Sequence, residues 1–401
     1  MNANTAERRA IVFSFSDIAN DPRVRRQVDW LTGAGWVVDT VGTGTAPVPK
    51  VRDAFTLHPP SRVSVSKAGL LLMHLLTSRR RRFRTQISDR IPQEALTRFR
   101  SGHYNLVVLN ETEFTPILSD SRDFTAEAKR AQVHVDLHEY HNPRMRRQTL
   151  GGRITAPYYR WVRNHIAHPD ITSRSVVNDP IGRLYVDEFG LPPLTPVHNA
   201  PPHFGLVPTP VDSDAIRLVH HGLAARQRGI AEMLEAMRVL PERFTLTLML
   251  TGNPALISEL EDLIDVHPAR DRIQLVPPVP MNEIVPRIHQ FDLEVIFFPP
   301  IGTNLALALP NKLFEAVQAG LGVVVGESPA MMDIVRDHGF GIVAPGFGWS
   351  DLAASIADLT ADDVARLKAA AHEAAPLLNA EVEGRAFLDA VEAGVRSRGG
   401  A

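Results

Sequence analysis

Short β-rich apolar runs alternate with longer amphipathic patterns along almost the whole chain, and this alternation restricts the possible folds most strongly. Strands separated by helices of this length predict βαβ units around parallel sheets. The alternation is interrupted once, by the proline-rich segment NAPPHFGLVPTPVDSD at 199–214, and it resumes afterwards. Proline-rich stretches of this kind are typical of linkers. The sequence therefore predicts an α/β protein with two doubly wound parallel-sheet domains in tandem.

The expected elements follow from the spacing of the apolar residues. The expected strands are Ala10–Phe15, Val37–Val41, Asn105–Leu109, Val133–Leu137, Ile171–Ser173, Ile216–Val219, Thr245–Leu250, Ile273–Val276, Leu293–Phe297 and Gly322–Val325. The expected helices are Pro22–Leu31, Pro92–Arg100, Ala156–Ile166, Pro180–Phe189, Ile230–Leu240, Pro254–Ile264, Met281–Ile288, Pro310–Ala319, Ala330–Val335 and a helical tail over 361–398. In such sheets ligands bind beyond the carboxyl ends of the strands, so we expect the two domains to face a central cleft.

The composition excludes or disfavours several classes of function. The 401 residues include 43 Lys and Arg, 45 Asp and Glu, and no cysteine. The near-neutral charge disfavours a general nucleic-acid-binding surface, and the lack of cysteine excludes a thiolate metal site and a cysteine nucleophile. No apolar segment reaches the ~20 residues needed to span a bilayer, and the N-terminus does not resemble a secretory signal. We therefore expect a cytoplasmic globular protein.

Residues 218–230, LVHHGLAARQRGI, combine a strand, a loop and the start of a helix. Gly222 permits a sharp turn and a close approach of the backbone to a ligand. Arg226 and Arg228 stand just before the helix, whose N-terminus favours anions, and their guanidinium groups add bidentate donors. This segment is a candidate phosphate or diphosphate site. The alternative is that both arginines are solvated loop residues.

Residues 309–320, LPNKLFEAVQAG, predict a helix bounded by a proline and a glycine. Asn311 and Glu315 are four residues apart and share a face of that helix, and Lys312 can also meet Glu315. At a strand-end pocket, Glu315 would bind a pair of sugar hydroxyls and Lys312 a phosphate. The alternative is a surface pair between Lys312 and Glu315, which contributes only a few tenths of a kcal/mol.

Residues 133–141, VHVDLHEYH, place several polar side chains at the end of a buried strand. His138 and Glu139 could supply an acid, a base or a polarising group that faces the cleft. One alternative is a metal site of His138, Glu139 and His141. It is disfavoured because no second acidic cluster supports it. The other alternative is that these residues only cap the strand.

The run RRRRFR at Arg79–Arg84 places five arginines in six positions, and the apolar stretch LLLMHLL precedes it. It could contact an anionic membrane surface, at ~1 kcal/mol for each basic residue near it. It could equally be a solvated helix face. A role in nucleic-acid binding is disfavoured because no matching basic surface or aromatic ladder accompanies it.

Taken together, these segments resemble the GT-B glycosyltransferases, and within them glycosyltransferase family 4. The resemblance is carried by DPRVRRQVDWLTGAGWVVDTVG, VDLHEY, HHGLAARQRGIAEMLEAM and LPNKLFEAVQAGLGVVVGESPAMMDIV, in that order over nearly the whole chain. It implies a Rossmann-like acceptor domain at 1–205 and a Rossmann-like donor domain at 206–378. It also implies a C-terminal helix at 379–401 that crosses back to the first domain.

The resemblance further implies the reaction. A hexosyltransferase of this kind moves a sugar from a nucleoside-diphosphate sugar, here a UDP- or GDP-sugar, to an acceptor hydroxyl. The acceptor would be a saccharide, a lipid-linked saccharide or a small natural product in glycan, glycolipid or natural-product biosynthesis. Members of the family generally retain the anomeric configuration and need no bound metal or other cofactor. Peripheral contact with the inner face of a membrane, through Arg79–Arg84, fits a lipid-linked acceptor.

Carried over residue by residue, the resemblance assigns the cations and the acid of the donor site. Arg228 matches the basic residue that steadies the diphosphate, and Lys312 is a second candidate for this role. Glu315 matches the second acid of the E-x7-E motif, which usually holds the ribose. The position of the first acid is occupied by Leu307. His138 matches the cleft histidine near the reacting sugar by rough position.

The sequence departs from the pattern of the resembled family at two positions, and two alternative functions remain open. Gly322 stands where many members of the family have proline, and Leu307 removes an expected contact with the donor. A nucleotide-sugar epimerase would act on the donor without an acceptor. A non-catalytic binding or partner protein could keep the same fold, and Leu307 keeps that alternative open. A nicotinamide oxidoreductase is disfavoured because no G-x-G-x-x-G follows the first strand.

Overall fold

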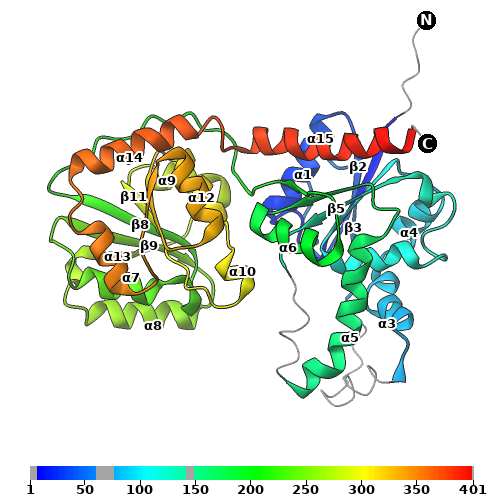
Figure 1. Cartoon of the computed structure of the whole chain (residues 1–401), viewed down its shortest axis with the longest axis horizontal. Coiled ribbons are helices and arrows are strands. Elements are labelled where there is room, and N and C mark those ends of the chain that lie inside the picture. The colour runs from blue at the N-terminus through cyan, green and yellow to red at the C-terminus, as the bar shows by residue number, and fades with distance from the viewer. Residues whose placement is uncertain (1–6, 60–75, 141–148, 400–401) are drawn as a thin grey trace, which may run out of the picture. The chain divides into compact units, whose positions relative to one another are not determined.

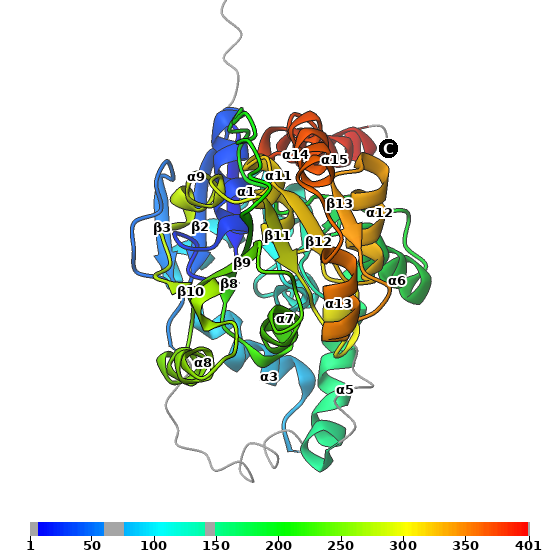
Figure 2. The same ribbon diagram turned by 90° about the vertical axis from the view of Figure 1, so that its left-hand side faces the viewer.

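The computed structural model describes residues 7–59, 76–140 and 149–399. The chain forms two compact units, which are described separately below. Unit 1 comprises Met1–Val197 with Gly384–Ala401, and unit 2 comprises His198–Glu383. Each unit contains one parallel β-sheet with helices on both faces (Figures 1 and 2). The two doubly wound domains predicted from the alternating pattern are therefore confirmed.

The sheet of unit 1 has seven parallel strands in the order β3-β2-β1-β4-β5-β6-β7. The strands are β1 (Arg9–Phe13), β2 (Val37–Gly42), β3 (Asp53–Thr56), β4 (Leu106–Asn110), β5 (Gln132–Leu137), β6 (Ser173–Val176) and β7 (Thr195–Pro196). The helices are α1 (Pro22–Gly33), α3 (Arg79–Gln86), α4 (Gln93–Arg100), α5 (Leu150–Asn164) and α6 (Asp179–Phe189), with 3-10 turns η1 (Ser88–Arg90), η2 (Thr112–Ser119), η3 (Ala128–Arg130) and η5 (His165–Ala167). The strand order 3-2-1-4-5 is that of Rossmann-like sheets.

Helix α1 starts where the sequence predicts it, because Asp21 caps its first turn and a proline follows. The Asp21 side chain accepts hydrogen bonds from the backbone N–H groups of Arg23 and Val24. The apolar stripe of α1 then packs on β1 and β4 in a core cluster that also contains Phe387. Phe387 lies on α15 (Ala380–Gly399), so the part of this helix after residue 383 contributes to the core of unit 1.

The sheet of unit 2 has six parallel strands in the order β10-β9-β8-β11-β12-β13. The strands are β8 (Ile216–Leu223), β9 (Phe244–Thr251), β10 (Ile273–Val276), β11 (Leu293–Ile296), β12 (Gly322–Val325) and β13 (Gly341–Val343). The helices are α7 (Ile230–Met237), α8 (Pro254–Asp265), α9 (Ile284–Ile288), α10 (Thr303–Ala306), α11 (Asn311–Gln318), α12 (Pro329–His338), α13 (Trp349–Ile356) and α14 (Ala361–Ala374), with 3-10 turns η6 (Arg226–Arg228), η7 (Arg270–Arg272) and η8 (Met281–Glu283).

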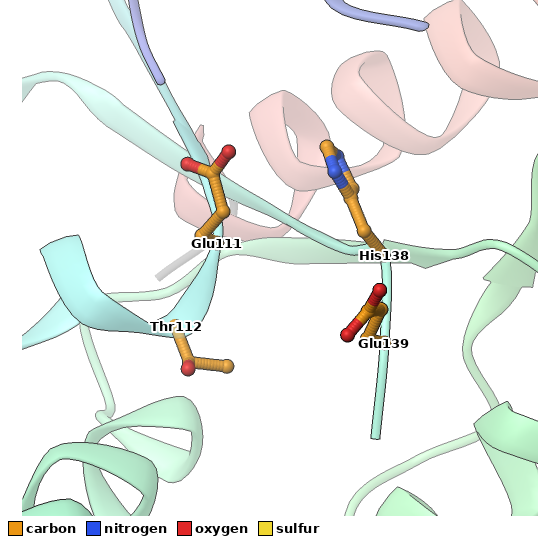
Figure 3. Close-up of a pocket in the computed structure, with 4 residues that line it drawn as sticks. All are labelled: Glu111, Thr112, His138 and Glu139. Atoms are coloured by element: carbon orange, nitrogen blue, oxygen red, sulfur yellow. The ribbon is translucent and has the colours of Figure 1, made fainter. Parts of the chain in front are cut away.

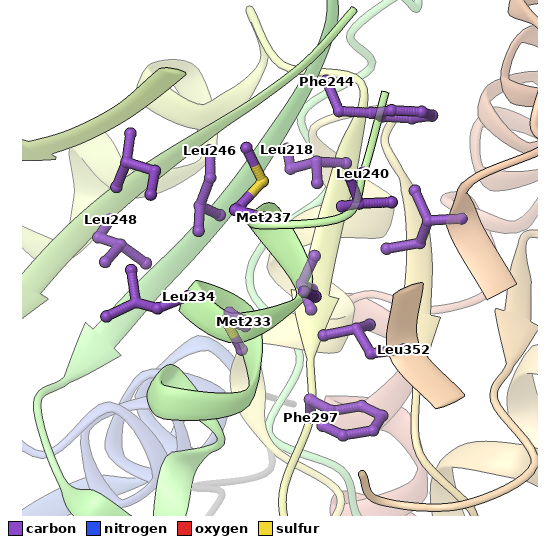
Figure 4. Packing of buried hydrophobic residues seen from close by; sticks show 14 of the residues in the cluster. Leu218, Met233, Leu234, Met237, Leu240, Phe244, Leu246, Leu248, Phe297 and Leu352 are labelled. Atoms are coloured by element: carbon purple, nitrogen blue, oxygen red, sulfur yellow. The ribbon is translucent and has the colours of Figure 1, made fainter. Parts of the chain in front are cut away.

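Two apolar cores cover the two faces of this second sheet. One core joins the sheet to α7, α8 and α13, and the other joins it to α9, α11, α12 and α14. Figure 4 shows the first core, with Met233, Leu234 and Met237 of α7 among leucines of β8 and β9. The site described below lies at one end of this sheet, and these two cores hold the strands that carry it.

The two units divide at positions that differ from the expected 205/206 and 378/379. The segment after residue 197 is held by unit 2, because the Asn199 side chain donates to Asn311 Oδ1 at 2.6 Å and the Phe204 N–H donates to Gln318 Oε1 at 3.1 Å. At the other end, the Glu383 carboxylate accepts hydrogen bonds from the backbone and ring of His198.

Several elements were not among those expected. The additional strands β3, β7 and β13 are short, and β3 is only half buried, so the apolar pattern does not mark them. Strand β6 lies at Ser173–Val176, slightly later than expected. The tail is two helices instead of one, because α14 ends just before Pro376, which cannot continue a helix.

Gly322 has a packing explanation. A Cβ atom at this position would lie 2.7 Å from Leu293 Cδ2 and 2.9 Å from Leu367 Cβ, which is closer than real Cβ atoms approach. Strand β12 begins at this tight crossing between β11 and α14. A proline ring would therefore not fit where many members of the resembled family have one.

Candidate functional site

A buried chain of three ionisable side chains lies between β8, β11 and α11 in unit 2. His221 Nδ1 is 3.1 Å from Glu294 Oε2, and His221 Nε2 is 2.8 Å from Glu315 Oε2. All three residues are buried. Burial opposes a charge on His221, but the two carboxylates outweigh it and raise the pKa of His221 to about 9. Each ring nitrogen therefore donates to one carboxylate, and His221 is an imidazolium at neutral pH.

Lys312 is buried beside this chain and does not form the surface pair with Glu315 that was considered. Its ammonium donates to the His221 backbone oxygen and lies 3.3 Å from His220 Nε2. His220 Nδ1 donates to the Val295 oxygen, which leaves Nε2 as the acceptor of the Lys312 proton. Burial lowers the pKa of Lys312 to about 8, with the Arg228 charge acting in the same direction.

Gly222 makes room for this lysine. Its φ of 110° is in the region that favours glycine. A Cβ atom at Gly222 would lie 3.3 Å from Lys312 Nζ. The glycine therefore matters for the approach of the Lys312 side chain to the end of β8, in addition to the sharp turn and the approach of a ligand predicted from the sequence.

Arg226 and Arg228 leave the same short turn in different directions. Arg228 lies over the ring of Phe298, with its guanidinium carbon 4.5 Å from the ring centroid, and Lys312 Nζ is 5.1 Å from the same centroid. The Arg226 guanidinium instead pairs with Glu259 on α8, at 2.9 Å, and is mostly exposed. The structure thus brings Arg228 and Lys312 together and turns Arg226 away from them.

The two clustered cations are poorly neutralised. Within the described part of the chain, neither Arg228 nor Lys312 forms an ion pair, and Arg228 Nε is buried without a hydrogen-bond partner. The positive charges of Arg228, Lys312 and His221 outnumber the negative charges of Glu294 and Glu315. A buried excess of positive charge with an unsatisfied donor favours an anionic ligand at this edge of the sheet.

The sequence also associates Asn311, Glu315 and the position of Leu307 with a donor site. Asn311 begins α11, where its side-chain oxygen accepts from Asn199. Glu315 uses one carboxylate oxygen for His221, and its other oxygen keeps acceptor capacity. Leu307 follows α10 and is partly buried, so an apolar side chain stands where the family motif has an acid.

A second group of polar residues lies at the ends of β4 and β5 in unit 1. The two strands pair with Asn110 opposite Asp136, so the residues that follow them emerge side by side. Asp136 is fully buried and accepts two hydrogen bonds of 2.7 Å from Arg23. His138 Nε2 is 2.9 Å from Asp136 Oδ2 and 3.0 Å from Asn110 Oδ1. The buried acid therefore orients the histidine that the sequence singled out.

A pocket of about 270 Å³ opens at this place and is lined by Glu111, Thr112, His138 and Glu139 (Figure 3). Figure 3 shows the Glu111 carboxylate and the His138 ring rising from neighbouring chain segments on the same side of the pocket. Burial raises the pKa of Glu111 to about 7. Glu139 is exposed, and its backbone oxygen accepts from the Tyr185 hydroxyl at 2.6 Å.

Sequence reasoning missed Glu111, His221 and Glu294. Glu111 follows a buried strand just as His138 does, so the same signal would have found it. Glu294 lies inside the apolar strand β11, and His221 is one of two adjacent histidines on β8. The sequence around either residue does not indicate that the other is its partner. Only the pairing of β8 with β11 brings these two together.

No group of three or more histidine, aspartate and glutamate side chains is arranged to hold a metal ion in the described ranges. His141, the third residue of the metal alternative, lies outside them. Within the same ranges, none of the helices combines the length and the apolar character needed to cross a lipid bilayer.

Comparisons with known proteins agree with this architecture. Residues 208–376 match the family model described as glycosyl transferases group 1. A comparison with curated protein sequences gives no match.

Solved structures resemble the chain over nearly its full length. Sucrose-phosphate synthase from Thermosynechococcus elongatus is 15% identical with a TM-score of 0.64, covering 96% of this chain and 98% of that chain. Anabaena HepE in complex with UDP and glucose is 12% identical with a TM-score of 0.64, covering 96% and 100%. An α,α-trehalose-phosphate synthase (UDP-forming) from Burkholderia vietnamiensis is 12% identical with a TM-score of 0.65, covering 98% and 100%. The chain has the GT-B fold.

Proposed function

Because unit 2 is a group 1 glycosyl transferase domain, we propose that this enzyme transfers a sugar from a nucleoside-diphosphate sugar to an acceptor hydroxyl. One observation carries the proposal: Arg228 and Lys312, both without a carboxylate partner among the described residues, converge on the Phe298 ring at the end of the second sheet. This is the position where doubly wound sheets bind their ligands. A diphosphate supplies the negative charge that the cluster lacks.

The chemistry follows from these charges. When the sugar–phosphate bond breaks, negative charge develops on the leaving diphosphate. Lys312 is buried and Arg228 is partly buried, and in such a site this charge is stabilised more than in water. These cations can fill the role that a metal ion has in other transferases, which supports metal-independent transfer. The resemblance to family 4 favours retention of the anomeric configuration.

The remaining assignments concern the nucleoside and the acceptor. Glu315 has one carboxylate oxygen to accept from the ribose hydroxyls, and Asn311 stands at the start of the same helix. Solved structures of HepE contain UDP and UDP-glucose, so UDP-sugars are the first donors to test and GDP-sugars the second. We assign the acceptor hydroxyl to the His138 pocket of unit 1.

Replacing Arg228 by alanine should weaken the binding of UDP by about 2 kcal/mol, or roughly thirtyfold, because a hydrogen-bonded charge pair with the diphosphate is lost. The matched control is Arg226→Ala, which removes the same side chain two residues away where it pairs with Glu259. Isothermal titration calorimetry measures the affinities of both variants for UDP and GDP. Equal affinities for the wild type and Arg228→Ala would contradict the donor site, and no binding of either nucleotide would contradict the function.

Peripheral contact with an anionic membrane is part of the proposal. Arg79, Arg80 and Arg81 are exposed at the start of α3, whereas Arg82 lies over Tyr158 and Arg84 pairs with Asp120. Three exposed arginines contribute ~3 kcal/mol next to anionic lipid.

The triple change to glutamine at 79, 80 and 81 should reduce co-sedimentation with vesicles containing phosphatidylglycerol by tenfold or more, because the charge attraction is lost. High salt should reduce the co-sedimentation of the wild type in the same way. Arg270→Gln, an exposed arginine of unit 2, serves as the control. Equal co-sedimentation of the triple variant and the control would rule out this contact.

A further inference from the structure

The pocket at the ends of β4 and β5 contains a matched hydrogen-bond donor and acceptor. His138 Nε2 faces Asp136 and Asn110. Burial opposes the charge on His138, but Asp136 outweighs it and raises the pKa of the ring. A raised pKa favours the imidazolium form, in which Nε2 donates to the buried acid and Nδ1 is a second donor.

Glu111 supplies the acceptor. Its carboxylate accepts from the Ser14 hydroxyl at 2.9 Å and from the Phe15 N–H at 3.2 Å. A carboxylate has about four acceptor positions, so two remain after these contacts. The charge of His138 lowers the pKa of Glu111, and the charge of Glu113 raises it.

The backbone of Glu111 is held in a costly conformation. Its φ of 65° and ψ of 145° belong to a region that side chains other than glycine rarely adopt. Such strain persists only where the surroundings enforce it, and it often marks a ligand site. The conformation sends the chain from β4 into η2 and leaves the carboxylate at the pocket. Backbone strain and a partly buried carboxyl group therefore occur at the same residue.

A second observation beside the pocket also points to a ligand or a bound solvent molecule. Asn110 is fully buried, and among the described residues its side-chain nitrogen has no hydrogen-bond partner. Buried polar groups are almost always satisfied. The Asn110 amide is therefore a further donor next to His138.

We propose that Glu111 and His138 together bind one hydroxyl of a neutral, hydroxyl-rich saccharide acceptor, and that this pocket disfavours a phosphorylated one. The inference rests on the proposed transferase function and deepens it. A hydroxyl group both donates and accepts, so it satisfies the Glu111 carboxylate and the His138 N–H at once. A phosphate ester only accepts at neutral pH, and it would meet the carboxylates of Glu111 and Glu139 in the same pocket. Arg23, the cation nearest to His138 in this network, is already committed to Asp136.

The test measures saccharide binding to the full chain by saturation-transfer NMR, in the presence of saturating UDP. The probes are a set of neutral methyl glycosides (glucoside, galactoside, mannoside and N-acetylglucosaminide) and, separately, the 6-phosphates of the same sugars. The wild type should bind at least one neutral glycoside, and at least tenfold more tightly than its 6-phosphate. Glu111→Gln should weaken this binding at least tenfold without changing the affinity for UDP. Glu127→Gln, the same change at an exposed glutamate of unit 1 that does not line the pocket, should bind like the wild type.

The pH profile separates a binding role from a structural one. Since burial raises the pKa of Glu111 to about 7, wild-type saccharide binding should fall as the pH drops below 7. The raised pKa of His138 favours its charged form over the same range. Binding by Glu111→Gln, though weaker, should be independent of pH there. Glu111→Gly, which removes the side chain and the backbone strain together, should be at least as stable as the wild type and should not bind.

Three outcomes would overturn the inference: wild-type affinity in Glu111→Gln, tighter binding of the 6-phosphates, or no binding of any neutral glycoside while UDP binds. Failure of UDP itself to bind would contradict the proposed function and would thus be distinguishable from these.

Discussion

Replacing Lys312 by methionine should lower the rate of sugar transfer by about 10²–10³-fold while unit 2 stays folded. The ammonium of Lys312 is one of the two cations that converge on Phe298, near the position assigned to the diphosphate, and it donates to the His221 backbone oxygen. Loss of a fixed positive charge removes stabilisation of the leaving group that exists mainly in the transition state. The change leaves no buried carboxylate unpaired, because Glu315 and Glu294 keep their contacts with His221.

The measurement is the steady-state rate with UDP-sugars, with thermal unfolding as the test of folding. The matched control is Lys368→Met, a second buried lysine of the same unit. Lys368 contacts Asp292 at 2.8 Å. Its loss leaves Asp292 with Arg217 as its remaining ion-pair partner among the described residues, and should reduce stability instead of catalysis. Full activity of Lys312→Met would contradict the assignment of Lys312 to the diphosphate.

The pH dependence gives an independent check on the same residue. Burial lowers the pKa of Lys312 to about 8, and a bound diphosphate would raise it again. Binding of UDP should therefore be constant below pH 8, and it should weaken above pH 8 with proton uptake on binding. The nucleotide affinity of Lys312→Met should lack this alkaline decline. A decline that persists in the variant would assign the titration to another group.

The difference between Arg226 and Arg228 illustrates what the sequence could and could not predict. The strand–turn–helix pattern located the turn correctly, and both arginines were candidates for the same anion. The turn η6 sends one side chain to Glu259 and the other over Phe298. These partners come from α8 and from the chain after β11, which are distant in the sequence. Local pattern therefore predicts the position of a loop, whereas tertiary contacts decide which of its side chains reach the site.

Buried charges show the same limit more clearly. Glu294 lies in the middle of an apolar strand, where periodicity predicts only a core residue. Its partner His221 comes from a strand that is not adjacent in sequence. The parallel sheets themselves were predictable because the alternation of strands and helices repeats many times. A single buried acid and its partner occur once, so no repeated pattern in the sequence predicts them.

Replacing Asp136 by alanine should destabilise unit 1 by about 3–5 kcal/mol, the largest effect on folding that we expect from a single change in this unit. Asp136 is fully buried and accepts hydrogen bonds from Arg23, Gln27, Ser175 and His138. Removing the acid leaves Arg23 buried with one backbone acceptor and, among the described residues, no counter-charge. The cost of that uncompensated charge exceeds any gain from the smaller side chain.

Tryptophan fluorescence during urea unfolding can follow this loss, because Trp30, Trp36 and Trp161 lie in unit 1 and only Trp349 lies in unit 2. The fluorescence midpoint should therefore move to lower urea concentration in Asp136→Ala. Asp271→Ala removes an aspartate that is 93% exposed and should change the stability by no more than about 0.5 kcal/mol. A difference of less than about 1 kcal/mol between the two variants would show that Asp136 is not a structural centre of unit 1.

Acid pH should remove the difference between Asp136→Ala and the wild type. Although burial opposes its ionisation, Arg23 and His138 hold the pKa of Asp136 well below its usual range. A carboxyl group with a lowered pKa contributes stability above the pKa of its unfolded state, about 3.9, and loses that contribution as the pH falls. The destabilisation should therefore be complete at pH 6 and should shrink progressively below about pH 4. A destabilisation that stays constant down to pH 3 would mean that Asp136 acts through packing and not through its charge.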